Sequence, residues 1–197
     1  ILLSGGSAFG LEASCGVREY LEERGIGFDV GVTKVPLVCQ SCLFDLAVGE
    51  IGTRPDKAMG YEACKNAETG NYKDGSYGAG TGATVGKVKG MDFCMKSGIG
   101  SYAVKTGELM VGAVVAVNAL GDIFDWKTGK KAAGLLGEDR KTFLDSEEEM
   151  LKINQVIENK FAGNTTIGAV FTNAEFNKTK LCKIAGMAHD GYARSIR

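Results

Sequence analysis

Apolar residues recur along the chain with two different periods, which predict strands and helices in mixed order. Continuous or alternating apolar runs predict strands over residues 1–3, 28–32, 35–46, 91–104, 110–119, 122–126 and 165–172. Helical spacing of apolar residues predicts helices that follow Ser7, Asp56, Ser146 and Asn177. This order predicts an α/β protein (α+β layered), with helices packed against sheet.

Local signals refine these elements. Ser7 is expected to cap the first helix, which ends at Gly25, and Asn177 to cap the last. Ser146 and Glu149 form a capping box for a helix that runs to about Asn159. The short turns between 91–104, 110–119 and 122–126 favour one contiguous sheet, and the charged stretch 127–145 is expected to be a surface excursion.

Composition is that of a soluble globular protein with one domain over 1–197. The 197 residues are 44% hydrophobic and 24% charged, and the net charge is −1. The longest apolar run, 110–117, falls well short of the ~18–20 residues that cross a bilayer. We therefore expect no nucleic acid and no membrane as partner, and a peptide or amide small molecule as substrate.

Cysteine and histidine usage argues against a metal site. Most of the six cysteines lie inside apolar segments, which favours free thiols, a reducing compartment and hence a cytoplasmic location. Cys39 and Cys42 form a lone CxxC, and His189 is the single histidine of the chain. We expect neither a metal nor a cofactor.

The two ends of the sequence interrupt predicted elements. The chain begins at Ile1, inside a strand-like run with no initiator methionine, and stops at Arg197, inside a helical pattern. We expect a fragment of a longer chain that lacks both ends.

Glycine is abundant, at 29 residues, and gathers in the corner 78–87. A phosphate-binding loop fails here because Thr81 stands where its first glycine should be and Val88 where its hydroxyl should be. The GxGxxA spacing lacks the hydrophobic strand that precedes a dinucleotide-binding turn. The corner can still form a pocket floor to which Lys87 adds an ammonium, although spacing alone favours a solvated lysine at a strand end.

Two other polar signals have competing interpretations. Gly5 to Gly10 misses the GxSxG spacing because Phe9 replaces the last glycine, and His189 with Asp190 has no serine nearby in sequence, so a Ser-His-Asp triad is a weak candidate. Asn118 ends an apolar strand, where a buried amide needs partners. It is either a satisfied structural group or a donor aimed into a pocket.

The segment 163–170 places a hydroxyl-rich corner directly before a β-branched apolar run. Cleavage of the Asn164–Thr165 bond would give Thr165 a free α-amine, so that nucleophile and base share one residue. A turn that enters a strand has the same pattern and is favoured by spacing alone.

Taken in order, several motifs make the chain resemble the DmpA-type L-aminopeptidase/D-esterase family, which includes β-peptidyl aminopeptidases and a nylon-oligomer hydrolase. The matching segments are 3–11, 25–28, 35–36, 44–46, 78–83, 117–121, 164–168 and 187–191. The resemblance implies an αββα sandwich, a mechanism like that of N-terminal-nucleophile hydrolases, and a homo-oligomer of processed subunits.

The resemblance also implies site residues. Thr165 matches the first residue of the smaller subunit, so that 165–197 begins that subunit and 1–164, ending at Asn164, belongs to the larger one. Asn118 matches an oxyanion-binding asparagine, and Lys87 a lysine that some members use. We assign Gly80, Gly82 and Ser7 to substrate binding. A further polar or acidic pair of the family lies beyond Arg197.

The expected activity is therefore hydrolysis of N-terminal peptide or amide bonds through a threonine acyl-enzyme. One alternative is acyl transfer to an amine, as in the related ornithine acetyltransferases. Another is an uncleaved, non-catalytic binding protein of the same fold, and a nucleotide-binding α/β protein is the most distant.

Overall fold

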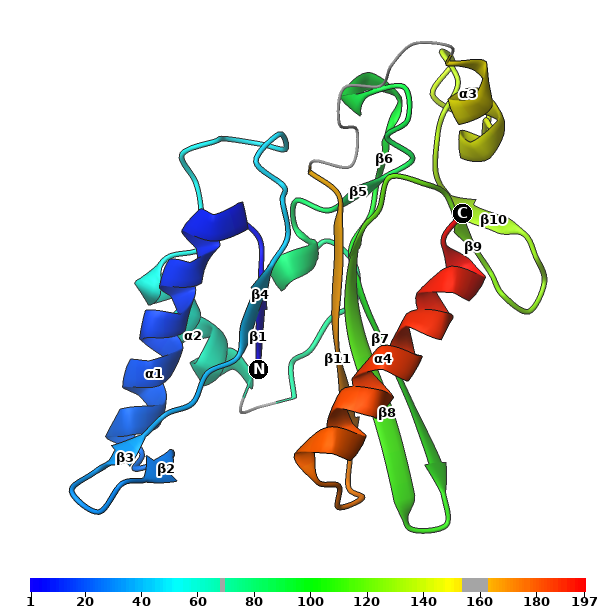
Figure 1. Cartoon of the computed structure of the whole chain (residues 1–197). Helices are drawn as coiled ribbons and strands as arrows, with labels where there is room; N and C mark the ends of the chain where they lie inside the picture. The colour runs from blue at the N-terminus through cyan, green and yellow to red at the C-terminus, as the bar shows by residue number, and fades with distance from the viewer. Residues whose placement is uncertain (68–69, 154–162) are drawn as a thin grey trace.

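A three-stranded antiparallel sheet runs through the middle of the molecule in the computed structural model (Figure 1). The structure describes residues 1–67, 70–153 and 163–197. The strand order is β11 (Thr165–Thr172), β8 (Leu109–Asn118), β7 (Ile99–Thr106). Because β8 and β11 are antiparallel, the last residue of β8 and the first residue of β11 lie side by side at one end of the sheet. We call this end of the strands the edge of the sheet.

Helix α4 (Lys178–Ser195) crosses this sheet (Figure 1). Asn177 caps it as predicted, since its side-chain oxygen accepts the Lys180 N–H at 3.0 Å. A Cβ atom built on Gly168 of β11 would lie only 2.6 Å from the Tyr192 hydroxyl of α4. A glycine at this position therefore lets the helix pack close to the strand.

The first part of the chain forms a second group of elements on the opposite side of the sheet from α4 (Figure 1). Strands β1 (Leu2–Ser4) and β4 (Gln40–Cys42) pair in parallel. Tyr20 of α1 (Ala13–Glu23) and Tyr61 of α2 (Lys57–Ala67) meet edge to face, with ring centroids 5.4 Å apart, and join these two helices. The elements are β1 (Leu2–Ser4), η1 (Ser7–Glu12), α1 (Ala13–Glu23), β2 (Phe28–Asp29), β3 (Lys34–Val35), β4 (Gln40–Cys42) and α2 (Lys57–Ala67).

Short elements connect these two groups and surround the edge at which β8 ends. They are η2 (Gly78–Gly80), β5 (Thr84–Val85), η3 (Met91–Phe93), β6 (Met95–Lys96), β9 (Ile123–Phe124), β10 (Lys131–Ala133) and α3 (Ser146–Lys152). The predicted extension of the last of these helices to Asn159 lies outside the described residues.

The hydrophobic core joins the two groups. Its buried members are Leu43, Ala79, Ala83 and Ala116, with Leu3, Ile99 and Ile167 packed against them. Ala116 is fully buried two residues before the end of β8. The core therefore anchors the strand end that carries Asn118.

The mixed helix and strand composition confirms an α+β protein. In Figure 1, β1 and β4 lie between the helices α1 and α2 and the three-stranded sheet, and α4 runs across that sheet. The specific αββα sandwich remains a prediction. No helix in the described ranges is both long and apolar enough to cross a membrane.

Four strand predictions were wrong in extent. Residues 28–32 are a strand only over β2, because the chain then turns into the hairpin that pairs β2 with β3. Residues 35–46 do not form one strand, because β3 pairs with β2 in a hairpin before Pro36 and β4 pairs with β1 after it. Residues 91–104 are broken between β6 and β7, because the chain passes from a pairing with β5 to one with β8 around Gly98. Residues 122–126 do not extend the sheet, since β9 pairs with β10.

Two predicted helix caps were also wrong. Gly6 is the N-cap of η1, and no side chain caps it. The Ser7 N–H instead donates to the Leu43 carbonyl at 2.8 Å. Helix α3 is capped by Asp145, whose carboxylate accepts the N–H groups of Glu147 and Glu148 at 2.9 and 3.0 Å. A carboxylate that accepts two N–H groups at a helix start is a favourable cap, and these bonds lower the pKa of Asp145.

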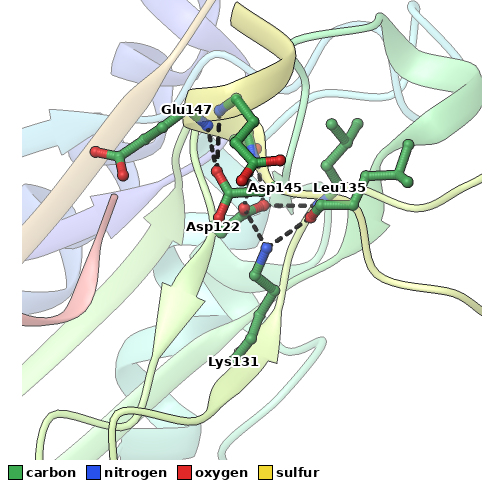
Figure 2. Close-up of polar contacts among 8 residues, drawn as sticks. Asp122, Lys131, Leu135, Asp145 and Glu147 are labelled. Carbon is green, nitrogen blue, oxygen red and sulfur yellow. Dashed lines mark hydrogen bonds and ion pairs between the residues drawn. The ribbon is translucent and has the colours of Figure 1, made fainter.

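Ser146 serves a different purpose, because it binds the buried carboxylate of Asp122, which Figure 2 shows with Lys131 and Leu135. Asp122 is 1% exposed, and it accepts the Ser146 N–H and hydroxyl at 2.8 Å, the Leu135 N–H at 2.7 Å and the Lys131 ammonium at 2.7 Å. The Asp122 N–H donates to the Arg197 carbonyl at 2.6 Å. The Asp122 carboxylate thus joins the loop after β8 to strand β10 and the start of α3, and the Asp122 backbone N–H binds Arg197.

Candidate active site

Asn118 ends β8 with its side chain fully enclosed by hydrogen-bond partners. Its Oδ1 accepts the Thr84 N–H at 3.1 Å, the Thr84 hydroxyl at 3.4 Å and the Lys87 ammonium at 2.7 Å. Its Nδ2 donates to the carbonyls of Phe44 at 2.6 Å and Gly163 at 3.2 Å. An N–H and an ammonium only donate and a carbonyl only accepts, so these partners permit one orientation of the amide.

Lys87 lies against the loop that follows β8 and binds it by hydrogen bonds. Its backbone N–H donates to the Leu120 carbonyl at 2.7 Å, and its ammonium contacts both the side chain and the carbonyl of Asn118, the latter at 3.3 Å. Burial lowers the pKa of Lys87 to about 8, because the charged form loses hydration and its partners at Asn118 are neutral. Lys87 is therefore a lysine that titrates close to neutral pH.

Thr165 begins β11 directly opposite Asn118. The two residues are register partners in the antiparallel pair, and Thr166 is paired with Val117. Both Asn164 and Thr165 are partly buried. The structure therefore brings four of the predicted residues, Thr165, Asn164, Asn118 and Lys87, to one edge of the sheet.

A cleft of about 420 Å³ opens at this edge, and we call it the Lys87 cleft. Asn118 is hydrogen-bonded to four of the residues that line it, Thr84, Lys87, Phe44 and Gly163. The cleft is lined by Phe44, Asp45, Ala47, Val48, Thr84, Lys87, Val88, Lys89, Gly90, Met91, Leu120, Gly163 and Asn164. It is large enough to hold one or two residues of a peptide or a short amide chain.

The three predicted substrate-binding residues lie elsewhere. Among the described lining residues of the Lys87 cleft, Ser7, Gly80 and Gly82 are absent. Gly82 lines a second, mostly apolar cleft of about 600 Å³, which shares Asp45 with the first. Gly80 is buried against the backbone of Ile99, and Ser7 lies at the start of η1.

The His189 and Asp190 pair does not form part of this edge. His189 is exposed on α4, where its Nδ1 lies 3.2 Å from the Ala185 carbonyl and its ring meets that of Tyr192 edge to face. Within the described chain, the structure therefore offers no support for a Ser-His-Asp triad.

Sequence reasoning missed Thr84, Phe44 and Gly163. Thr84 lies inside the glycine corner 78–87, which ends at Lys87, so its hydroxyl could have been considered as a partner of that site. Phe44 and Gly163 contribute backbone carbonyls, for which a sequence carries no side-chain signal. Their roles depend on which segments the core brings together.

The geometry places a buried amide, hydrogen-bonded to a lysine, opposite the threonine that begins a strand. The family model for peptidase family S58 matches residues 1–197, so the chain belongs to that family. It is 38% identical over 206 residues to an uncharacterized aminopeptidase of Mycobacterium leprae, covering 100% of this chain and 55% of the relative. It is 33% identical over 201 residues to a 6-aminohexanoate-oligomer endohydrolase of Agromyces sp., with the same two coverages.

The same coverage recurs in other relatives. An uncharacterized aminopeptidase of Mycobacterium tuberculosis is 38% identical over 204 residues, which cover 100% of this chain and 56% of the relative. The chain thus spans about half the length of the curated relatives that it matches.

Proposed function

We propose that this chain carries the nucleophile of a self-processing aminopeptidase or amidase that cleaves N-terminal peptide or amide bonds through an acyl-enzyme on Thr165. The observation that carries the proposal is the pairing of Thr165 with Asn118, whose amide is held in one orientation at the same strand edge. Membership of a peptidase family supports the reaction class.

Maturation is the first use of the Thr165 hydroxyl. Its Oγ attacks the carbonyl carbon of Asn164, the bond from that carbon to the Thr165 nitrogen breaks, and an ester links Asn164 to Thr165 Oγ. The Thr165 nitrogen takes up the hydroxyl proton as it becomes an amine. Water then hydrolyses the ester, which leaves a carboxylate on Asn164 and a free α-amine on Thr165.

Turnover is the second use of the same hydroxyl. The Thr165 α-amine accepts the hydroxyl proton while Oγ attacks the substrate carbonyl, and it returns the proton to the departing amine when the tetrahedral intermediate collapses. Water, deprotonated by the same amine, releases the acyl group. An α-amine has an ordinary pKa of about 7.7–8.0, so it is a suitable base near neutral pH.

Asn118 supplies the oxyanion donor in this scheme. One of its N–H groups would point at the developing negative charge, an interaction that contributes about 2.7–4 kcal/mol in comparable sites. Lys87 holds the opposite end of the amide at 2.7 Å, so its positive charge polarises the N–H groups of Asn118. The same charge lowers the pKa of a nearby α-amine and keeps it neutral.

Two variants test self-processing in the full-length protein. Thr165→Ala should remain a single polypeptide, whereas the neighbouring Thr166→Ala should be cut like the wild type, because only the first threonine adjoins the scissile bond. Mass spectrometry of each purified protein gives the readout. Cleavage of Thr165→Ala at the Asn164–Thr165 bond would contradict the proposal, and an uncut wild type would favour a non-catalytic binding protein.

Added amines separate hydrolysis from acyl transfer. A hydrolase releases free acid from an aminoacyl p-nitroanilide in the presence of a millimolar amine, whereas an acyltransferase forms the new amide as its main product. Assembly into a homo-oligomer of processed subunits and a cytoplasmic location stay predictions of the same proposal.

A further inference from the structure

Gly163 has a backbone conformation that other residues avoid. Its φ angle is +92°, in the left-handed half of conformational space, where a Cβ atom collides with the backbone. The residue lies two positions before Thr165, so this turn sets the direction in which the chain enters β11.

The side chain of Phe44 closes the space beside Gly163. A Cβ built on Gly163 would lie 3.1 and 3.2 Å from two carbons of the Phe44 ring. The carbonyl of the same Phe44 accepts one N–H of Asn118 at 2.6 Å. Phe44 therefore supports both the glycine turn and the amide.

The carbonyl of Gly163 accepts the other N–H of Asn118 at 3.2 Å. Asn118 is also the register partner of Thr165. The two residues that flank Asn164 are thus each fixed relative to Asn118, one through a side-chain hydrogen bond and one through strand pairing. Between these two points lies the Asn164–Thr165 peptide bond.

We propose that Gly163 is a positioning residue for self-cleavage, which rests on the proposed function: its left-handed turn against Phe44 directs its carbonyl to Asn118 and so holds the Asn164–Thr165 bond beside the amide. The uncut chain uses both N–H groups of Asn118, one of them for Gly163. Cleavage ends the covalent link from Gly163 to Thr165 and lets a substrate oxyanion take the place of the Gly163 carbonyl.

Gly163→Ala tests this role, with Gly31→Ala as the matched control. Gly31 has a φ angle of +88° in the turn between β2 and β3, and a Cβ there meets nothing within 4 Å. The two variants therefore carry similar backbone strain, but only one changes the site. The readouts are the rate of self-cleavage of the full-length protein, turnover per cleaved molecule, and the melting temperature.

We expect Gly163→Ala to slow self-cleavage about five- to thirty-fold, the factor that a left-handed penalty of about 1–2 kcal/mol gives. Gly31→Ala should cleave at the wild-type rate. Turnover per cleaved molecule should stay within about twofold of wild type in Gly31→Ala, and in Gly163→Ala it should fall by a smaller factor than self-cleavage does, because the Gly163 carbonyl leaves Asn118 after the cut. Similar melting temperatures would show that the difference is local.

Three results would overturn the proposal while self-processing stands: wild-type cleavage by Gly163→Ala, equal slowing in both variants, or a parallel loss of cleavage and turnover. A wild-type protein that is never cut before Thr165 would refute the proposed function itself, and the role of Gly163 with it.

Discussion

Thr165 lies directly opposite Asn118 where β11 begins and β8 ends, and the Asn118 amide is held there by five hydrogen bonds to four residues. An oriented amide donor beside a threonine is the central feature of the site. Its orientation depends on hydrogen bonds to Thr84, Lys87, Phe44 and Gly163, which the sequence did not predict. Each group can be tested separately.

Asn118→Asp keeps the shape of the side chain and removes both donors. The carboxylate would face the carbonyls of Phe44 and Gly163, which offer no proton. We expect turnover per cleaved molecule to fall about a hundred- to a thousand-fold, the usual effect of losing an oxyanion donor, and self-cleavage to slow as well because the Gly163 carbonyl loses its donor. Time courses on denaturing gels measure the rate of self-cleavage, and hydrolysis of an aminoacyl p-nitroanilide measures turnover. Asn177→Asp is the control, because aspartate also caps a helix, and comparable slowing in that variant would argue against a specific role of Asn118.

The pH dependence of self-cleavage tests Lys87 before the α-amine of Thr165 exists. The pKa of Lys87 is lowered to about 8 by burial, so its charge is present below pH 8 and lost above it. If the ammonium polarises Asn118, the cleavage rate falls as pH rises through about 8. If neutral Lys87 acted as the base for the Thr165 hydroxyl, the rate would rise instead.

Substitution of Lys87 provides the control for that profile. Lys87→Arg keeps a charge that does not titrate in this range, so the fall near pH 8 should disappear. An unchanged profile in this variant would assign the titration to another group.

Thr84→Val separates the hydroxyl of Thr84 from its N–H. The hydroxyl contact with Asn118 is long, at 3.4 Å, and the N–H contact at 3.1 Å survives the substitution. We expect self-cleavage to slow by only about two- to fivefold, less than in Lys87→Met, which loses the 2.7 Å ammonium contact. The reverse ranking, measured in the same assay, would mean that the amide is oriented mainly by the hydroxyl.

Asp122→Asn tests the network that holds the loop after β8. Asp122 is 1% exposed and its carboxylate pairs with Lys131, which would be left as a half-buried charge without a counterion. We expect a loss of about 3–5 kcal/mol in the free energy of unfolding, measured by urea denaturation. Glu62→Gln, which breaks an exposed ion pair with Lys65, should cost less than about 1 kcal/mol. Equal costs would show that burial of Asp122 carries no special weight.

The strands that carry the site could be predicted because long apolar runs determine them locally. Residues 110–119 and 165–172 match β8 and β11 to within a residue. The polar end of the first run and the hydroxyls at the start of the second drew attention to Asn118 and Thr165, whose expected roles came from the family resemblance. Their register could not be predicted, since it depends on pairing between segments 45 or more residues apart and on the core around Ala116.

Other features depend on competition that no local pattern reveals. Ser146 and Asp145 were both suitable caps, and buried Asp122 decides between them by binding Ser146. The predicted strand over 91–104 breaks near Gly98, where the Ser97 N–H donates to the Ala83 carbonyl and the chain turns toward Gly75. Tertiary hydrogen bonds outweigh the β-propensity of this segment.

The most direct test of Thr165 as nucleophile is the mass and N-terminal sequence of the smaller fragment, before and during reaction with a slowly hydrolysed aminoacyl ester. The account predicts a fragment that begins Thr165-Thr166-Ile167 and gains the mass of one acyl group on its N-terminal peptide. A fragment that begins at another residue, or acyl label found only elsewhere on the protein, would contradict it.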